Sequence, residues 1–241
     1  MIATSMVTRD DVEAALMRTR AVVRHTPLTL VEPGVLSGTV MFKLEQLQHA
    51  GTFGVRAVFN QVLAALERSA FDPAAGIAAT APYARHIGRV LGLPVTIGAN
   101  DDEAAARAGA TGALLCRDDD PDAVAGIGAI GLEVWTQTAG QIDTVIAPPA
   151  LTDGLSSALA GRVSVVEAPF RPDRDTAVAR LLWEERRIAV DPSSAAAYAM
   201  LHCELYRPEP GERVVLVLAS AIEWAPYGAP AFSPFTANAG E

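Results

Sequence analysis

Lys43 is the only lysine among the 241 residues of this chain, so any chemistry that needs a lysine side chain must use it. A lysine amine becomes a nucleophile when burial lowers its pKa. Glu45 stands two positions later, and side chains two apart on a strand share one face. This spacing favours an ion pair between Lys43 and Glu45, or a solvated lysine, over a nucleophilic role.

The other candidates for acid–base catalysis are the titratable residues Glu45, His86, Glu133 and Asp153. Their positions in the sequence do not bring any two of them together. Tyr83, Arg85 and His86 are closely spaced, and an arginine can hold a carboxylate through two parallel hydrogen bonds. This run predicts either a polar rim for a carboxylate ligand or the solvent-facing first turns of a helix.

Cysteines, histidines and glycines show no further site. Cys116 and Cys203 lack a C-x-x-C spacing and a nearby histidine at ligand spacing, so we expect two buried free thiols. The four histidines are scattered, without H-E-x-x-H or H-x-H, so we expect no metal site. Gly126, Gly128 and Gly131 resemble G-x-G-x-x-G, but no acidic residue follows a second strand at the right distance, and a dinucleotide site is not expected.

Composition narrows the class of partner. The formal net charge of -9 disfavours nucleic acids and anionic membranes, because there are too few basic side chains to neutralise phosphates. The N-terminus carries acidic residues where a signal peptide needs an apolar core, and no run of about 18 apolar residues occurs. We expect a soluble, cytoplasmic protein whose partners are small molecules or other proteins.

Short apolar runs rich in β-branched residues alternate with alanine-rich stretches of helical length, which predicts an α/β fold with parallel sheets flanked by helices. Thr8 and Asp11 resemble a capping box. The Asp/Pro-rich stretch 117–122 is a predicted crossing between two lobes, and 224–241 an irregular arm. The expected strands are 40–44, 77–80, 95–97, 113–116, 144–147, 163–167 and 214–218. The expected helices are 8–24, 55–68, 84–91, 102–108, 124–138, 154–159, 176–187 and 193–206.

Five segments, in order, resemble the fold type II enzymes that depend on pyridoxal phosphate (PLP), specifically threonine dehydratase and serine racemase. They are DDVEAALMRTRAVVRHTPL (10–28), KLEQLQHAGTFGVRAVFN (43–60), VAGIGAIGLEVWTQ (124–137), VDPSSAAAYAML (190–201) and GERVVLVLASA (211–221). The resemblance implies the tryptophan synthase beta-like fold in a truncated form. It also implies two lobes, with 1–45 and 117–241 in the large, cofactor-type lobe and 46–116 in the small one.

The resemblance further implies a lysine that forms a Schiff base with PLP and then acts as a base on the substrate. In the family motif T-G-S-F-K, residues 50–54 of this chain read Ala-Gly-Thr-Phe-Gly, so Gly54 stands at the lysine position. Glycine can neither form the Schiff base nor transfer the proton. We therefore expect no covalent cofactor, and PLP only as a weak non-covalent ligand.

Three other family loops are altered as well. The tetraglycine loop that cradles the cofactor phosphate corresponds to residues 151–154, where Asp153 is alternatively the N-cap of a helix beginning near Gly154. The S-G-N-H loop corresponds to 80–86 without its asparagine, and S-G-G-N to 219–222, where Ser220 remains as an isolated donor. The expected remains of the ligand cleft are Thr52, Phe53, Gly54, Tyr83, Arg85, His86, Thr152, Asp153, Gly154 and Ser220.

These losses, in a chain shorter than the family's catalytic domain, predict a degenerate threonine/serine dehydratase-like protein. The prediction is a non-catalytic pseudoenzyme that binds a small molecule, amino-acid-like or a carboxylate, or acts as a regulatory or assembly subunit. A homodimer or a complex with another protein is expected by analogy with the family. Two alternatives stay open: a PLP-dependent amino-acid lyase of the serine/threonine ammonia-lyase type, and an enzyme of altered, PLP-independent chemistry in the same cleft.

Overall fold

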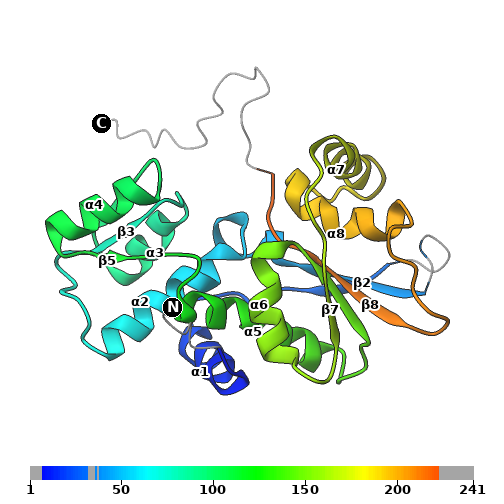
Figure 1. Cartoon of the computed structure of the whole chain (residues 1–241), viewed down its shortest axis with the longest axis horizontal. Helices are drawn as coiled ribbons and strands as arrows, with labels where there is room; N and C mark the ends of the chain where they lie inside the picture. The colour runs from blue at the N-terminus through cyan, green and yellow to red at the C-terminus, as the bar shows by residue number, and fades with distance from the viewer. Residues whose placement is uncertain (1–6, 32–35, 37, 223–241) are drawn as a thin grey trace, which may run out of the picture.

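The computed structural model describes residues 7–31, 36 and 38–222, which form two sheets surrounded by helices (Figure 1). The larger sheet has the strand order β1-β2-β8-β6-β7, in which β1 is antiparallel to β2 and every other pair is parallel. The smaller sheet is parallel, with the order β4-β3-β5. The strands are β1 (Leu28–Leu30), β2 (Thr39–Leu44), β3 (Ile77–Ala79), β4 (Val95–Ile97), β5 (Leu114–Leu115), β6 (Thr144–Ala147), β7 (Ser164–Glu167) and β8 (Arg213–Leu218).

The helices begin where local sequence favours a start. Thr8 and Asp11 form the predicted capping box at the first helix, and a proline occupies the first turn of each of the last four. The helices are α1 (Arg9–Thr19), α2 (Gly54–Glu67), α3 (Ala84–Leu91), α4 (Asp101–Thr111), α5 (Pro121–Gln137), α6 (Pro149–Leu159), α7 (Pro172–Arg186) and α8 (Pro192–His202). Two short 3-10 turns, Glu45–Leu47 and His49–Gly51, lead from β2 to α2.

Helices cover both faces of the larger sheet. Val215 and Val217 of β8 belong to a core cluster with residues of α1, α5 and α6, whereas Val214 and Leu216 belong to a second cluster with residues of α7 and α8. The alternation follows from the strand repeat of two residues. Because both faces are buried, β8 reads as a continuous apolar run, as the sequence indicated.

Helix α2 connects the two sheets. Its Ala57 packs in the cluster with α1, α5 and α6, while Val55 and Phe59 pack in a third cluster with α3 and the smaller sheet. The strands of the smaller sheet all fall within 77–115, and those of the larger sheet within 28–44 and 144–218. The exact lobe boundaries at 45/46 and 116/117 stay predictions.

The glycines of α5 bring helices close together. A Cβ on Gly154 of α6 would lie 2.6 Å from the carbonyl oxygen of Val124 and 2.7 Å from the amide nitrogen of Gly128. The G-x-G-x-x-G look-alike therefore lies inside a helix, where Gly128 permits the close approach of α6.

All seven predicted strands are observed, and the α/β prediction with parallel sheets is confirmed. Some details differ. The short edge strand β1 was not predicted, and α6 begins at Pro149 instead of Gly154. Helix α1 ends at Thr19 instead of residue 24, and α8 ends at His202 instead of residue 206. Cys203 is exposed whereas Cys116 is buried. The predicted arm 224–241 lies outside the described residues. Across residues 7–31, 36 and 38–222, no helix has both the length and the apolar character needed to cross a bilayer.

Candidate functional site

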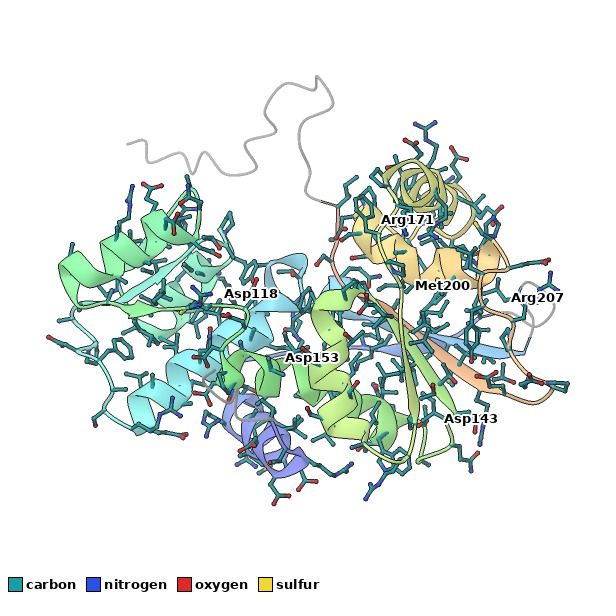
Figure 2. All side chains as sticks on the ribbon, viewed as in Figure 1. Asp118, Asp143, Asp153, Arg171, Met200 and Arg207 are labelled. Carbon is teal, nitrogen blue, oxygen red and sulfur yellow. The ribbon has the colours of Figure 1, made fainter. Side chains whose placement is uncertain are left out.

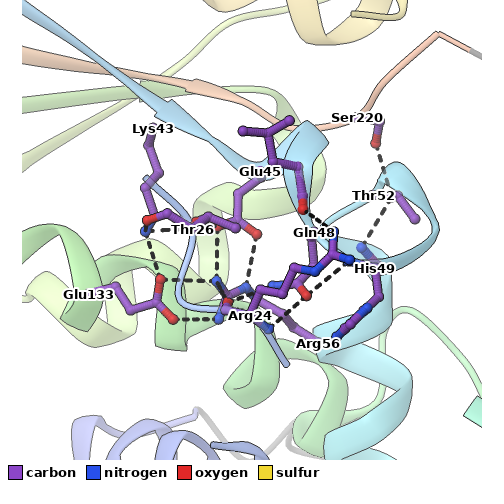
Figure 3. A network of polar contacts seen from close by, with 12 residues as sticks. Arg24, Thr26, Lys43, Glu45, Gln48, His49, Thr52, Arg56, Glu133 and Ser220 are labelled. Carbon is purple, nitrogen blue, oxygen red and sulfur yellow. Dashed lines mark hydrogen bonds and ion pairs between the residues drawn. The ribbon is translucent and has the colours of Figure 1, made fainter. Parts of the chain in front are cut away.

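Four charged side chains form a buried ion cluster next to the segment that leads from β2 to α2: Lys43, Glu45, Arg56 and Glu133 (Figure 3). The Arg56 guanidinium lies between the two carboxylates. It donates to Glu45 at 2.9 and 3.0 Å and to Glu133 at 2.7 and 3.0 Å. Bidentate pairs of this kind are among the strongest hydrogen-bonded ion pairs in proteins.

Lys43 uses all three of its hydrogen-bond donors within this cluster. Its Nζ donates to Glu133 Oε2 at 2.6 Å, to the Thr26 carbonyl oxygen at 2.9 Å and to Gln137 Oε1 at 3.0 Å. The predicted pairing with Glu45 is present at 4.0 Å, but Glu133 is the closer partner. Lys43 has no exposed side-chain surface, so its amine is held in the interior.

The cluster is balanced, with two cations facing two carboxylates. Burial lowers the pKa of Lys43 despite the opposing attraction of Glu133 and Glu45. Burial would also lower the pKa of Arg56 and raise that of Glu133. Glu45 and Glu133 nevertheless raise the pKa of Arg56, and Arg56 and Lys43 lower that of Glu133. Two candidate catalytic carboxylates, Glu45 and Glu133, are thus brought together, but each is committed to cations.

The lysine position of the family motif is filled by a different side chain. Gly54 is the first residue of α2, and a Cβ placed on it would lie 2.3 Å from Oη and 2.4 Å from Cζ of Tyr83. No real Cβ tolerates such distances, so the Tyr83 ring occupies the space that a side chain at position 54 would need. The residues around Gly54 therefore do not fit a PLP held through a lysine.

The segment before Gly54 is tied to the end of β8. Phe53 N donates to the Ala219 carbonyl oxygen at 3.1 Å, and Ser220 Oγ donates to Thr52 Oγ1 at 3.0 Å. Thr52 Oγ1 also accepts from Gly54 N at 3.2 Å. The structure thus brings Thr52, Phe53, Gly54, Tyr83 and Ser220 together, and the Ser220 hydroxyl donates to the protein itself. That they form a ligand cleft stays a prediction.

Thr152, Asp153 and Gly154 lie inside α6, separate from this group. The helix has begun by Pro149, so the prediction that Asp153 caps a helix starting near Gly154 is wrong. Pro149 has a fixed φ suited to the first helical position, which explains the earlier start. Asp153 is exposed on α6 (Figure 2), Thr152 Oγ1 donates to the Pro149 carbonyl oxygen, and Gly154 packs against α5.

Arg85 and His86 have different surroundings from Tyr83. Arg85 is exposed, whereas the His86 ring stacks on His49 with centroids 4.8 Å apart. His86 Nδ1 lies 3.0 Å from Arg89 Nη2, and its Nε2 is buried without a hydrogen-bond partner in the described part of the chain. Partial burial, Arg24, Arg89 and the neighbouring imidazole lower the pKa of His49, and burial, Arg89 and Arg24 lower that of His86.

The sequence did not predict a pocket of about 220 Å³ beside Tyr83. It lies where α2, the ends of β3 and β5 and the start of α4 meet. Burial and the charges of Asp120 and Asp118 raise the pKa of the Cys116 thiol to about 12, so this cysteine stays protonated near neutral pH. The available signal was the acidic run 118–120, which the sequence had indicated only as a lobe crossing. The pocket is lined by Val58, Ala79, Thr80, Ala81, Tyr83, Asp101, Cys116, Arg117, Asp118 and Asp119.

The chain is similar in structure to several solved proteins. No family model and no curated protein matches the chain. The crystal structure of a threonine deaminase from T.th. matches with a TM-score of 0.73 and 21% identity over 90% of this chain and 98% of that chain. Maize serine racemase matches with a TM-score of 0.77 and 14% identity over 90% and 95%. Cystathionine beta-synthase from Bacillus anthracis gives 0.61 and 17% over 82% and 95%. The chain therefore has the fold of the fold type II PLP-dependent enzymes, as the sequence motifs indicated.

Proposed function

We propose that this protein is a non-catalytic, dehydratase-like protein that binds a small molecule in what remains of the family cleft and acts as a regulatory or assembly subunit in the cytoplasm. The observation that carries this proposal is the Tyr83 ring, which fills the space beside Gly54. In this chain the space that a side chain at position 54 would need is used for packing.

Lys43 offers no route back to the family chemistry. Its amine is fully buried and donates to three oxygens, and Glu133 lies 2.6 Å away. Moving Lys43 into a cleft would leave Glu133 with one cation fewer in a desolvated place, which is costly. This supports the proposal against the alternative of a PLP-dependent serine or threonine lyase.

The alternative of a new, PLP-independent chemistry has less support from the geometry. Of the four candidate acid–base residues, Glu45 and Glu133 bind Arg56 and Lys43, His86 stacks on His49, and Asp153 is exposed on α6. An acid–base mechanism that uses a pair of these groups needs both of them within reach of one bound substrate. These side chains are distributed over three places.

A covalent PLP adduct provides the test. Purified protein is incubated with PLP, treated with borohydride and analysed by intact mass and peptide mapping, with an active serine dehydratase as positive control. We expect no adduct on Lys43 and no keto acid released from serine or threonine. An adduct mapped to Lys43, or keto acid formed by homogeneous protein, contradicts the proposal.

The proposal includes non-covalent PLP as a weak ligand and a homodimer or protein complex as the assembled state. Equilibrium dialysis with PLP measures the first, and sedimentation velocity of the purified chain measures the second. A dissociation constant in the micromolar range or tighter for PLP contradicts the expected weak binding.

A further inference from the structure

The pocket beside Tyr83 has an apolar wall and an acidic wall. Val58 of α2, Ala79 and Ala81 after β3, and the Tyr83 ring supply apolar surface. Asp101 at the start of α4 and Asp118 and Asp119 after β5 supply carboxylates, and Figure 2 shows Asp118 beside β5. Such a combination of apolar surface with a few polar groups is typical of small-molecule sites.

The acidic wall has more negative than positive charge. Arg117 is the only basic residue that lines the pocket, and its guanidinium already binds Asp119 at 2.8 and 3.1 Å. Asp101 and Asp118 have no ion pair within the described ranges. Three carboxylates against one guanidinium leave a net charge of about -2 at neutral pH.

Two polar groups in the pocket also lack hydrogen-bond partners. The Cys116 side chain lines the pocket although the residue is only 8% exposed, and its thiol makes no hydrogen bond to any residue of the described chain. The Tyr83 side chain is only partly buried, and its hydroxyl forms no hydrogen bond within the described chain, so it is free to bond to solvent or to a ligand atom.

The pKa values of two acidic groups in the pocket are raised, which is consistent with an excess of negative charge. Partial burial, Asp101 and Asp119 raise the pKa of Asp118. Burial, Asp118 and Cys116 raise the pKa of Tyr83. In both cases neighbouring acids disfavour the charged form, and a bound cation would act in the opposite direction.

We propose that this pocket binds a small organic cation, a primary amine or diamine, with its ammonium group near Asp101 and Asp118 and its carbon chain against Tyr83 and Val58. The aromatic face of Tyr83 favours a cation as well as alkyl groups. This inference rests on the proposed function, because Tyr83 borders both the space beside Gly54 and this pocket.

The charges argue against two other ligands. An amino acid or another carboxylate would bring a negative group into a pocket whose one guanidinium is already paired. A metal ion needs several ligands converging on one point, and the described residues contain no group of three or more histidine, cysteine, aspartate or glutamate side chains that could hold one.

Calorimetric titration with 1,4-diaminobutane tests the proposal, with butane-1,4-diol as an uncharged molecule of the same length and succinate as its anionic counterpart. We expect the diamine to bind and neither control to bind. Asp118→Asn should weaken diamine binding about tenfold, which corresponds to the loss of one charge contact. Asp153→Asn, an exposed change on α6, should leave the affinity unchanged.

Several results would overturn this inference. They are no diamine binding at millimolar concentration, equal binding of the diol, equal weakening by Asp118→Asn and Asp153→Asn, and displacement of the diamine by equimolar calcium. Circular dichroism of each variant shows whether it is folded. A PLP adduct contradicts the proposed function whatever the diamine does, whereas absent diamine binding without an adduct contradicts only this ligand class.

Discussion

Helix α2 contributes to two charged regions of opposite character. Its Arg56 belongs to the buried ion cluster, where two cations face two carboxylates, whereas its Val58 lines the pocket beside Tyr83, where carboxylates outnumber cations. The balanced region is closed to solvent, and all three donors of its Lys43 are used. The unbalanced region borders a cavity, and its polar groups have unused bonding capacity. The difference separates charges that hold the fold together from charges that are available to a ligand.

The segment 43–60, which resembles a motif of the family, contributes three residues to the ion cluster. Lys43, Glu45 and Arg56 all stand in the segment that resembles the family's K-x-E-x-x-Q-x-T-G-S-F-K-x-R pattern, and all three belong to the ion cluster. Gly54 stands in the same segment at the position of the reactive lysine. The charged residues of the motif that form the ion cluster are therefore present, and the lysine that would form the Schiff base is absent.

The largest expected effect is on the ion cluster. Glu133→Gln leaves Arg56 and Lys43 buried with one carboxylate between them, and breaking a buried pair in this way costs about 3–5 kcal/mol. Urea unfolding measures the loss. Glu67→Gln is the matched control, because Glu67 pairs with Arg18 but is 58% exposed, and exposed pairs contribute at most about 1 kcal/mol. Equal losses in the two variants would show that the cluster does not stabilise the fold.

The next effect concerns the packing of Tyr83 on Gly54. Gly54→Ala should destabilise the protein by about 1–3 kcal/mol, because the new methyl group overlaps the Tyr83 ring. Alanine is otherwise the better residue in a helix. Gly109→Ala in α4, where a Cβ meets nothing within 4 Å, should therefore stabilise by about 0.5–1 kcal/mol.

A double-mutant cycle sharpens this prediction. In a Tyr83→Ala background the overlap is removed, so Gly54→Ala should lose most of its cost, measured by urea unfolding of all four proteins. Additive effects of the two changes would mean that Tyr83 does not occupy the space beside position 54. The central support for the proposed function would then be lost.

Local patterns explain which elements the sequence predicted correctly. Most of the seven predicted strands are runs of Val, Ile, Ala and Leu, and Gly54 is identified by its place in a motif. β1 was missed because it is a three-residue edge strand with two exposed positions, which leaves no apolar run to detect. The start of α6 was misplaced because the alignment to a glycine loop was given more weight than Pro149, although proline at a first helical position is itself a signal.

The site was harder to predict because its contacts join distant residues. Glu133 pairs with Lys43 and Arg56, although the whole smaller sheet lies between them in the sequence. Tyr83 contacts the space beside Gly54, although β3 lies between the two in the sequence. Neither contact has a periodic signature in a single sequence. The pocket likewise depends on the ends of β3 and β5 lying side by side, which their pairing with each other determines.

A smaller effect is expected where the stacked pair His49 and His86 lies close to Arg24 and Arg89. Because the folded protein lowers the pKa of both imidazoles, the unfolded chain binds more protons below about pH 6.5. The contribution of the two histidines to the free energy of unfolding should therefore be fully present at neutral pH and should fall as the pH drops below 6.5. Thermal unfolding between pH 7.5 and 5 measures the trend.

His49→Gln provides the control for this titration. Removing one imidazole of the pair should reduce the fall in melting temperature between pH 7.5 and 5, because one of the two disfavoured protonations is gone. NMR titration of the His86 ring measures the remaining protonation directly. A ring that titrates at or above its ordinary value near 6.5 would contradict the expected shift.

The smallest effect is expected at Asp153, and it tests how α6 begins. If Asp153 were an N-cap, replacing it with alanine would cost about 1 kcal/mol. Because α6 already begins at Pro149, Asp153→Ala should change stability by less than about 0.5 kcal/mol, the usual range for an exposed surface position. Asp191→Ala is the matched comparison, since Asp191 accepts from Ser194 N at the start of α8 and should show the full cost of a lost cap. A cost at Asp153 equal to that at Asp191 would mean that the chain before Gly154 is a loop. That result would make a phosphate-binding turn in this chain credible again.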